Sequence, residues 1–447
     1  MSITICNPIV IIIPGSPLPI TRVAMEVDIY YAIIEYEKPV AITELSSALI
    51  HVQGEIHIRG EATAQLPKQQ YSVKLKQEPA QGNFLGMSGG GKHWVFNDCG
   101  AVDPTLIRNP FAFALQRKME QYASDYTYFE LYICDPGTDI HNVPANLDKY
   151  YHGTYLNFEK IRFDSSSINL PYDKNKSTDD YAILQLNQHS SKYYQFPLNP
   201  PLTANVEIYE PADYELSSAL KSSFTSWYYD ANSNGWAGNF ATAYNTYVLQ
   251  QKPIPESIFQ EIRSTTDYKS FATYFLINEL AKDPDGYHKS TFMVKNKLVV
   301  KAGPLWDKNK SFGNAATLGT SDPYVDPQGW LFNMTGQAPI WWNILIKDPE
   351  FCSEVWNQWK TYLAPTTGSL NNDKSWLLDF IDLQYNYLFK QTEMQQRDAK
   401  RWPDTTNTPT AYQTQLTELK TYINQRILWI SATIKNFLEQ ESGAQLT

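Results

Sequence analysis

The sequence predicts an α+β fold in two lobes, and two observations indicate it. Early in the chain, "EIHIRG" (55–60) and "QYSVKLK" (70–76) alternate polar and apolar residues, which is the period of a half-buried sheet. From about residue 340 onward, apolar residues recur with the period of an α-helix. Strands followed by helices are typical of the α+β class. We therefore expect a β-rich N-terminal lobe over residues 1–163 and a mainly helical C-terminal lobe over residues 164–447.

The first helix is expected where the strand pattern is interrupted. Residues 103–121, "DPTLIRNPFAFALQRKMEQ", have a helical period. Asp103 is the expected N-cap, and Pro104 occupies the first helical position. Pro110 predicts either a kink or a restart within this helix. Residues 127–163 then return to strands.

The later elements include one clear helix and one clear hairpin. Residues 165–265 are expected to mix loops with short helices. "SFATYFLINELAKD" (270–283) predicts a helix. "KSTFMV" and "KLVVKAG" predict two strands that are joined by a polar turn at residues 295–297. Two long helical stripes follow, "SWLLDFIDLQYNYLFKQTEMQQRDAKRW" and "AYQTQLTELKTYINQRILWISATIKNFL".

Composition excludes several classes of function. The 447 residues are enough for one large or two ordinary domains, and an aromatic content of 14% argues against disorder. The net charge of −10 makes nonspecific binding to nucleic acid or to an anionic membrane unfavourable. A local basic cluster can still hold a small anion such as a nucleotide.

The cysteines and the N-terminus predict a cytoplasmic protein. Four widely spaced cysteines form no CxxC pair, which fits a reducing compartment and argues against a disulfide scaffold or a zinc site. The N-terminus lacks a basic region, and Pro14 interrupts its apolar run, so we expect a buried strand over residues 8–13 and no signal peptide. No apolar stretch reaches the ~18–20 residues of a membrane span. The cysteines are Cys6, Cys99, Cys134 and Cys352.

Two aspartates flank the predicted hairpin. Asp285 lies in "DPDGYHKS", directly after the predicted helix, and Asp307 follows the second strand in "GPLWDKNKSFGN". A hairpin returns the chain to its origin, so both carboxylates can face one space. They would repel each other unless a cation or a shared proton intervened, and Mg²⁺ prefers oxygen ligands of this kind. Alternatively, Asp307 could simply cap the turn at residues 308–311.

The order helix, Asp loop, hairpin, Asp is the order that protein kinases use. Further motifs make the chain resemble the spore coat protein H (CotH) kinase family, an atypical protein-kinase-like group. The matching segments are "IHIRGEATAQLPKQQYSVKL", "HWVFNDCGAVDPTLIRNPFAFAL", "HGTYLNFEKI", "KDPDGYHKSTFMVKN" and "GPLWDKNKSFGN". "NPIVIIIPGSPLPI" resembles the family's opening strand, and "KDPEFCSEVWNQW", "RDAKRWP" and "LKTYINQRILWI" resemble its helical C-terminus.

The resemblance implies a two-lobed, protein-kinase-like fold and a Ser/Thr kinase. Its substrate would be a protein or peptide, and its cofactors would be ATP with Mg²⁺ or Mn²⁺. Asp285 would be the catalytic aspartate and Asp307 the main metal ligand. Asn309 stands where many relatives have a second Asp, and Ser290 stands in place of Asn. Both replacements weaken the expectation of a second metal.

The resemblance also suggests residues for the nucleotide. Basic residues on the first strand pair would contact the phosphates, although the sequence does not decide between the lysines. A segment joining the lobes would meet adenine, and a residue of the first helix would orient the phosphates. The candidates are Arg59, Lys68 and Lys74 on the strand pair, Glu159 at the joining segment and Arg108 on the helix.

Other interpretations remain open at this point. "GMSGGGKH" (86–93) nearly matches a phosphate loop, but His93 replaces the Ser or Thr that would bind Mg²⁺ and a strand is expected to follow. Asp283-Pro284-Asp285 is a D-x-D triplet, as in glycosyltransferases, but no nucleotide-binding βαβ region precedes it. A pseudokinase that binds nucleotide without turnover, and transfer of AMP in place of phosphate, are the two rivals to kinase activity. Substrate identity and oligomeric state stay open.

Overall fold

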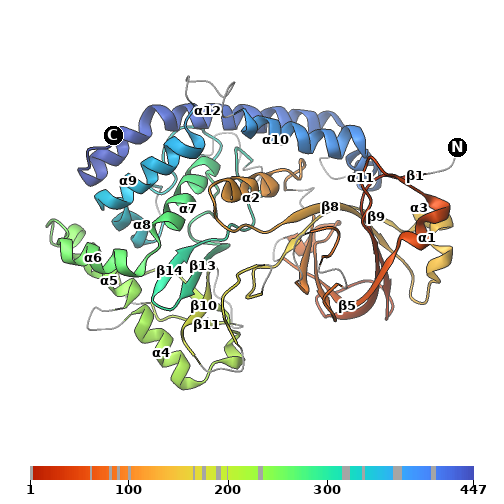
Figure 1. Cartoon of the computed structure of the whole chain (residues 1–447), viewed down its shortest axis with the longest axis horizontal. Coiled ribbons are helices and arrows are strands. Elements are labelled where there is room, and N and C mark those ends of the chain that lie inside the picture. Colours follow the sequence, from red (N-terminus) through yellow and green to blue (C-terminus); the bar gives the residue numbers. More distant parts are fainter. Residues whose placement is uncertain are drawn as a thin grey trace. The chain divides into compact units, whose positions relative to one another are not determined.

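The computed structural model shows an α+β protein whose chain divides into two compact units (Figure 1). Unit 1 comprises Met1–Pro110, Ser124–Asn169 and Asp379–Thr417, and unit 2 comprises the remaining segments. Each unit is described by itself. The structure describes residues 4–60, 63–79, 83–87, 91–98, 102–164, 167–173, 178–187, 193–198, 200–229, 235–314, 323–334, 338–365, 375–403 and 409–447.

Unit 1 is built on a closed β-barrel, which Figure 1 shows around β5, β8 and β9. Neighbouring strands are antiparallel, except that β2 and β8 close the barrel as a parallel pair. In barrel order the strands are β2 Ile9–Pro14, β3 Met25–Ala32, β5 Ile50–Ile58, β6 Tyr71–Leu75, β7 His93–Asn97, β9 Tyr151–Glu159 and β8 Tyr126–Ile133.

The opening strand is buried on both faces. Val10 and Ile12 point into the barrel core, whereas Ile9, Ile11 and Ile13 pack into a second apolar cluster outside it. This confirms the buried strand that the continuous apolar run predicts. The outer cluster also involves four short elements, namely β1 Thr4–Ile5, β4 Val40–Ala41, α1 Leu45–Ala48 and α3 Leu147–Tyr150.

Unit 2 contains a five-stranded antiparallel sheet. Its order is β11 Tyr194–Gln195, β12 Val206–Glu210, β10 Tyr181–Leu186, β13 Thr291–Asn296 and β14 Val299–Ala302. The last two strands form the predicted hairpin, with Asn296 paired to Val299 next to the turn. Helix α7, Tyr268–Ala281, packs against β14, and most of its residues are buried.

From residue 340 onward the described residues are mostly helical, as predicted. The remaining α-helices are α2 Arg108–Lys118, α4 Ser218–Tyr228, α5 Trp236–Tyr244, α6 Glu256–Thr265, α8 Ile340–Leu345, α9 Pro349–Gln358, α10 Trp376–Tyr385, α11 Met394–Arg401 and α12 Pro409–Ser442. Turns of π-helix cover Asn245–Leu249, Trp359–Leu363 and Asn386–Gln391. Short 3₁₀ turns cover Ile42–Glu44, Thr63–Gln65, Ile140–Asn142, Pro144–Asn146 and Asp213–Glu215.

The first helix is shorter than predicted, because it begins at Arg108 and not just after Asp103. The Asp103 carboxylate accepts hydrogen bonds from the backbone N–H groups of Thr105, at 3.2 Å, and of Arg108, at 3.1 Å. It therefore stabilises a turn before the helix. Pro110 falls in the first helical turn, where its missing N–H costs little.

The two units are not continuous in sequence, unlike the predicted lobes. Residues 111–123 belong to unit 2, and residues 379–417 belong to unit 1, where α11 packs against β9. The assignment of functional roles to lobes over residues 1–163 and 164–447 stays a prediction. Within the described part of the chain, no helix is both long enough and apolar enough to span a bilayer.

Candidate functional site

The loop after α7 presents the predicted catalytic aspartate. The helix ends at Ala281 and its C-cap is Lys282, whose φ of 43° is left-handed. Residues 283–290, here called the Asp loop, follow. Within it, Asp283 Oδ1 accepts a hydrogen bond from the Asp285 backbone N–H at 3.0 Å. This Asx turn is the local structure that an Asp-Pro-Asp-Gly sequence favours. The Asp285 carboxylate remains 30% exposed and lies 3.6 Å from Lys289 Nζ.

A glycine allows the Asp loop to pack tightly against α7. A Cβ atom added at Gly286 would lie 2.7 Å from Asn278 Oδ1 and 3.0 Å from the Asp283 carbonyl oxygen. The Gly286 carbonyl in turn accepts a hydrogen bond from the buried Tyr274 hydroxyl at 3.2 Å. The loop conformation is therefore determined by the helix on which it rests.

The β13–β14 hairpin leads into residues 303–314, here called the return loop. Leu305 N–H donates to Gln116 Oε1 at 2.9 Å, and the Trp306 ring packs against Phe292 with 5.9 Å between centroids. Asp307 follows with φ 56°, a left-handed conformation that Asp tolerates better than most residues. The Asp307 side chain is exposed, and its Oδ1 accepts a hydrogen bond from Asn309 Nδ2 at 2.7 Å.

A buried lysine joins the two loops. Lys308 is 0% exposed, and its Nζ lies 2.7 Å from Asp283 Oδ2 and 3.1 Å from Asn278 Oδ1. Burial alone would lower the pKa of the Lys308 ammonium, but the adjacent Asp283 carboxylate outweighs burial and raises it. The Phe312 N–H also donates to the Ala281 carbonyl at 2.7 Å. The predicted return of the hairpin to the end of the helix is thus confirmed.

The predicted metal ligands offer only oxygen donors, namely the Asp307 carboxylate, the Asn309 amide and the Ser290 hydroxyl. Ser290 precedes β13 with φ 48°, and Asn309 is 6% exposed. Such a set fits Mg²⁺ or Mn²⁺, which complete their coordination with water and phosphate oxygens. Among the residues that the structure describes, no three or more His, Cys, Asp or Glu side chains gather as a metal site. The ligand assignment stays a prediction.

Two of the nucleotide candidates belong to a neighbouring pair of barrel strands, one directly after β5 and one on β6. Arg59 follows β5, and its Nη1 donates to Gln70 Oε1 at 2.9 Å. Lys74 is exposed on β6, in register with Glu55 on one side and with His93 on the other. The exposed ammonium of Lys74 is accessible to an anion.

Lys68 has a very different environment, because it is 2% exposed. Its Nζ lies 2.8 Å from Asp98 Oδ1, 2.8 Å from Asp398 Oδ1 and 2.7 Å from the Thr154 carbonyl oxygen. Burial lowers the pKa of Lys68, but the two carboxylates outweigh it and raise the pKa. An ammonium has three N–H donors, so a phosphate would have to displace one of these oxygens.

The other two nucleotide candidates are also buried in unit 1. Arg108 is 1% exposed, and its Nη1 lies 2.6 Å from Asp103 Oδ1. Glu159 is 3% exposed at the end of β9, and its carbonyl accepts a hydrogen bond from the Ser124 hydroxyl at 3.3 Å. All five nucleotide candidates lie in unit 1, whereas the catalytic and metal candidates lie in unit 2. Their assembly into one site stays a prediction.

The phosphate-loop interpretation of "GMSGGGKH" gains no support. Residues 88–90 lie outside the described part of the chain, but the element that follows is strand β7, not the helix that a phosphate loop requires. Burial, reinforced by four nearby cations, lowers the pKa of His93 to about 3. The imidazole is therefore neutral at physiological pH.

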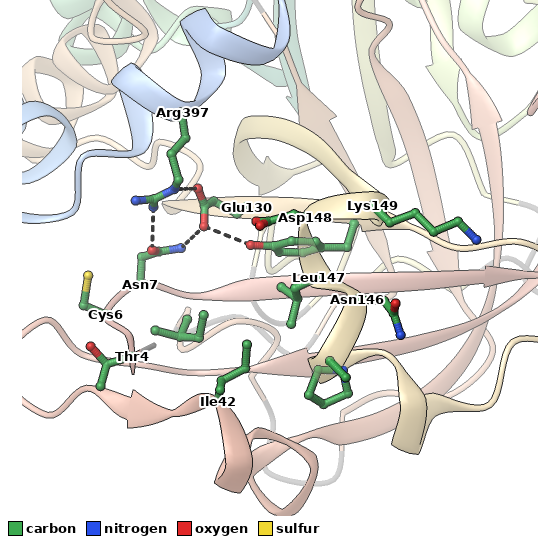
Figure 2. Close-up of a pocket in the computed structure, with 14 residues that line it drawn as sticks. Thr4, Cys6, Asn7, Ile42, Glu130, Asn146, Leu147, Asp148, Lys149 and Arg397 are labelled. Carbon is green, nitrogen blue, oxygen red and sulfur yellow. Dashed lines mark hydrogen bonds and ion pairs between the residues drawn. The ribbon is translucent and has the colours of Figure 1, made fainter. Parts of the chain in front are cut away.

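Unit 1 also contains a pocket of about 390 Å³ that sequence reasoning missed (Figure 2). On one wall, Glu130 accepts hydrogen bonds from Arg397 Nε at 2.6 Å, Asn7 Nδ2 at 3.2 Å and the Tyr132 hydroxyl at 3.2 Å. These bonds connect α11 to β8 and to Asn7, two residues before β2. None of the predicted site residues lines this pocket, whose residues are Thr4, Ile5, Cys6, Asn7, Ile42, Glu130, Tyr132, Pro144, Ala145, Asn146, Leu147, Asp148, Lys149 and Arg397.

Glu207 on β12 is a buried acid that no pattern in the sequence indicates. It is 2% exposed, and its Oε1 has no hydrogen-bond partner among the described residues. Burial raises the pKa of its carboxyl to about 7, even though a hydrogen bond with Gln195 on the neighbouring strand favours the charged form. Only the pairing of β11, β10 and β12 reveals this burial.

This acid should make the stability of unit 2 depend on pH. Below about pH 4.5 the carboxyl is protonated whether the chain is folded or unfolded. Between about pH 4.5 and 7 the unfolded chain loses the proton first, so stability falls, by about 3 kcal/mol in total. Glu207→Gln should therefore raise the free energy of urea unfolding at pH 8 and change it little at pH 4.5. The exposed Glu261→Gln is the control, and equal effects at both pH values would contradict the assignment.

A comparison with known protein families finds a match that covers most of the chain. Residues 56–430 match the model of the family described as CotH kinase protein, a description that indicates a kinase-type activity. No curated protein matches the chain. The matched range includes both loops and all the predicted site residues. Because it also covers most of the sequence, the protein belongs to the CotH kinase family.

Proposed function

We propose that this protein is an ATP- and divalent-metal-dependent kinase with a two-lobed, kinase-like arrangement. It would transfer the γ-phosphate of ATP to Ser or Thr of a protein or peptide. The observation that supports this best is the convergence of the Asp loop and the return loop, which are joined by Lys308 and Asp283 at 2.7 Å. Kinases place an acceptor-orienting aspartate and a metal-binding aspartate on two such segments.

Each loop residue has a distinct role in this proposal. Asp285 orients the acceptor hydroxyl and accepts its proton. Asp307, with Asn309, holds Mg²⁺ or Mn²⁺, and a bound ion would supply charge neutralisation on the transferred phosphoryl group. The Asn309 N–H donation to Asp307 Oδ1 fixes the orientation of both side chains. Little covalent chemistry is required of the protein, so catalysis comes mainly from positioning and electrostatics.

The nucleotide would contact unit 1 mainly through two basic residues that are not buried. Lys74 and Arg59 are proposed as phosphate contacts, with Glu159 near adenine and Arg108 orienting the phosphates. Lys68 is proposed to stabilise the barrel, because its N–H donors already have oxygen partners at 2.7–2.8 Å. Lys68 and Lys74, between which the sequence does not decide, therefore have different proposed roles.

The direct test is transfer of label from ATP. Wild-type protein incubated with γ-labelled ATP, Mg²⁺ or Mn²⁺ and Ser-rich peptides should label the peptides. Asp285→Asn should lower kcat by about 10²–10⁴-fold, because it removes the general base. Lys289→Gln, which changes the neighbouring cation, is the matched control for the loop. Absence of both transfer and ATP hydrolysis by the wild-type protein would refute kinase activity.

A pseudokinase is the second candidate, and the donor set is the observation that favours it. Asn309 provides a neutral amide oxygen where a carboxylate would bind a metal ion more strongly, and Ser290 provides a hydroxyl where an amide is expected. Thermal stabilisation by nucleotide without turnover would support this candidate. Labelling from α-labelled ATP, with loss of the γ-label, would instead indicate transfer of AMP.

A further inference from the structure

We infer that Lys308, together with Asp283 and Asn278, is a positioning device that fixes Asp285 and Asp307 relative to each other. The inference rests on the proposed function for the roles of the two aspartates. It adds three residues to which no role in the reaction has been assigned. All of them lie in unit 2, and all are buried, with exposures of 0% for Lys308 and Asn278 and 1% for Asp283.

The Asp283 carboxylate is the shared element of the device. Its Oδ1 accepts the Asp285 backbone N–H at 3.0 Å, and its Oδ2 accepts Lys308 Nζ at 2.7 Å. Lys308 is covalently adjacent to Asp307. One carboxylate therefore connects the backbone of the proposed acceptor-orienting residue to the backbone of the proposed metal ligand.

Asn278 anchors this connection to the helix. Its Oδ1 accepts a hydrogen bond from Lys308 Nζ at 3.1 Å, while its Nδ2 donates to the Tyr274 carbonyl within α7 at 2.9 Å. A Cβ atom added at Gly286 would lie 2.7 Å from Asn278 Oδ1, so glycine at this position lets the Asp loop lie close to the helix. Both loops are thereby held in position against the same helix, α7.

An apolar side chain could fill the buried space at position 308 without removing a charge from water. A buried ion pair rarely stabilises more than apolar side chains of the same volume, but it has directional bonds that apolar side chains lack. Reactions that depend on positioning lose about 10²-fold in rate when a group moves by about 1 Å. The ion pair is therefore better explained by its effect on the geometry of the two loops than by a contribution to the free energy of folding.

The test uses a double variant that removes both charges together. Lys308→Met with Asp283→Asn leaves no unpaired buried charge, so the chain should still unfold cooperatively. Lys310→Met, in the same return loop but partly exposed, is the matched control. The expected result is amide hydrogen exchange about tenfold faster in residues 283–290 and 303–314 together. In the same double variant, kcat should fall about 10²-fold, while KM for the peptide stays within about threefold of the wild-type value.

If the wild-type protein is active, either of two results would overturn the inference. Unchanged exchange in either loop would show that the pair does not hold the loops together. Faster exchange with unchanged kcat would show that the pair is structural and has no positioning role. If the wild-type protein transfers no phosphate, the proposed kinase activity is wrong, and Mn²⁺ binding by the same variants is measured in place of kcat. A Kd about tenfold weaker than that of the wild type supports the positioning role, and an unchanged Kd refutes it.

Discussion

Replacing Asp307 with asparagine should lower kcat for phosphate transfer by about 10²–10³-fold, the usual cost of removing one group that stabilises transition-state charge. The substitution removes the charge of the proposed metal ligand. Asn tolerates the left-handed backbone at φ 56° at least as well as Asp, and the Asp307 side chain is exposed, so stability should change by less than about 0.5 kcal/mol. Steady-state kinetics over a range of Mg²⁺ and Mn²⁺ concentrations measures the effect.

The control for this experiment is Asp326→Asn, an exposed aspartate of unit 2 outside both loops. It should keep wild-type kinetics. Higher metal concentration should partly restore the Asp307→Asn rate, because the carboxylate is proposed to bind the ion. Wild-type kcat in Asp307→Asn at low metal concentration would show that Asp307 is only a turn-capping residue.

Replacing Lys68 with methionine should destabilise unit 1 by about 3–5 kcal/mol, the usual cost of removing one partner from a buried ion pair. The change leaves the Asp98 and Asp398 carboxylates facing each other in the interior, where they are 3% and 1% exposed. Urea unfolding followed by tryptophan fluorescence measures the loss. Adding Asp98→Asn and Asp398→Asn to the same chain should recover part of it, because the repulsion disappears.

Lys74→Met is the matched control for Lys68→Met. Lys74 is exposed on β6, so the free energy of unfolding should change by less than about 0.5 kcal/mol, whereas KM for ATP should rise. The opposite pattern, with Lys68→Met stable and impaired in ATP binding, would assign the phosphate contact to Lys68.

The local elements near the site could be predicted from the sequence. The alternation in residues 55–60 and 70–76 predicted two strands, and β5 and β6 pair there with Ile56 opposite Val73. The helix expected over residues 270–283 is α7, and the hairpin after it is β13–β14. Each of these depends on contacts between residues close in sequence, so periodicity and turn composition are sufficient to predict them.

The long-range contacts could not be predicted in the same way. Closure of the barrel depends on the parallel pairing of Ile9 with Glu130, for which the sequence contains no local signal. The partners of Lys68 include Asp398, on a helix near the other end of the chain. Lys308 was likewise overlooked, because a lysine beside a predicted metal ligand gives no sign that it is buried. In each case the role of the residue depends on its burial and contacts in the folded structure, which the residue type alone does not indicate.

The most direct test of the central claim is mass spectrometry of a Ser-containing peptide after incubation with wild-type protein, ATP and Mg²⁺. The account predicts a single added phosphoryl group on a Ser or Thr hydroxyl, which is lost when Asp285 or Asp307 is replaced with asparagine. A peptide that carries AMP, or a peptide left unmodified while ATP binds, would contradict the account.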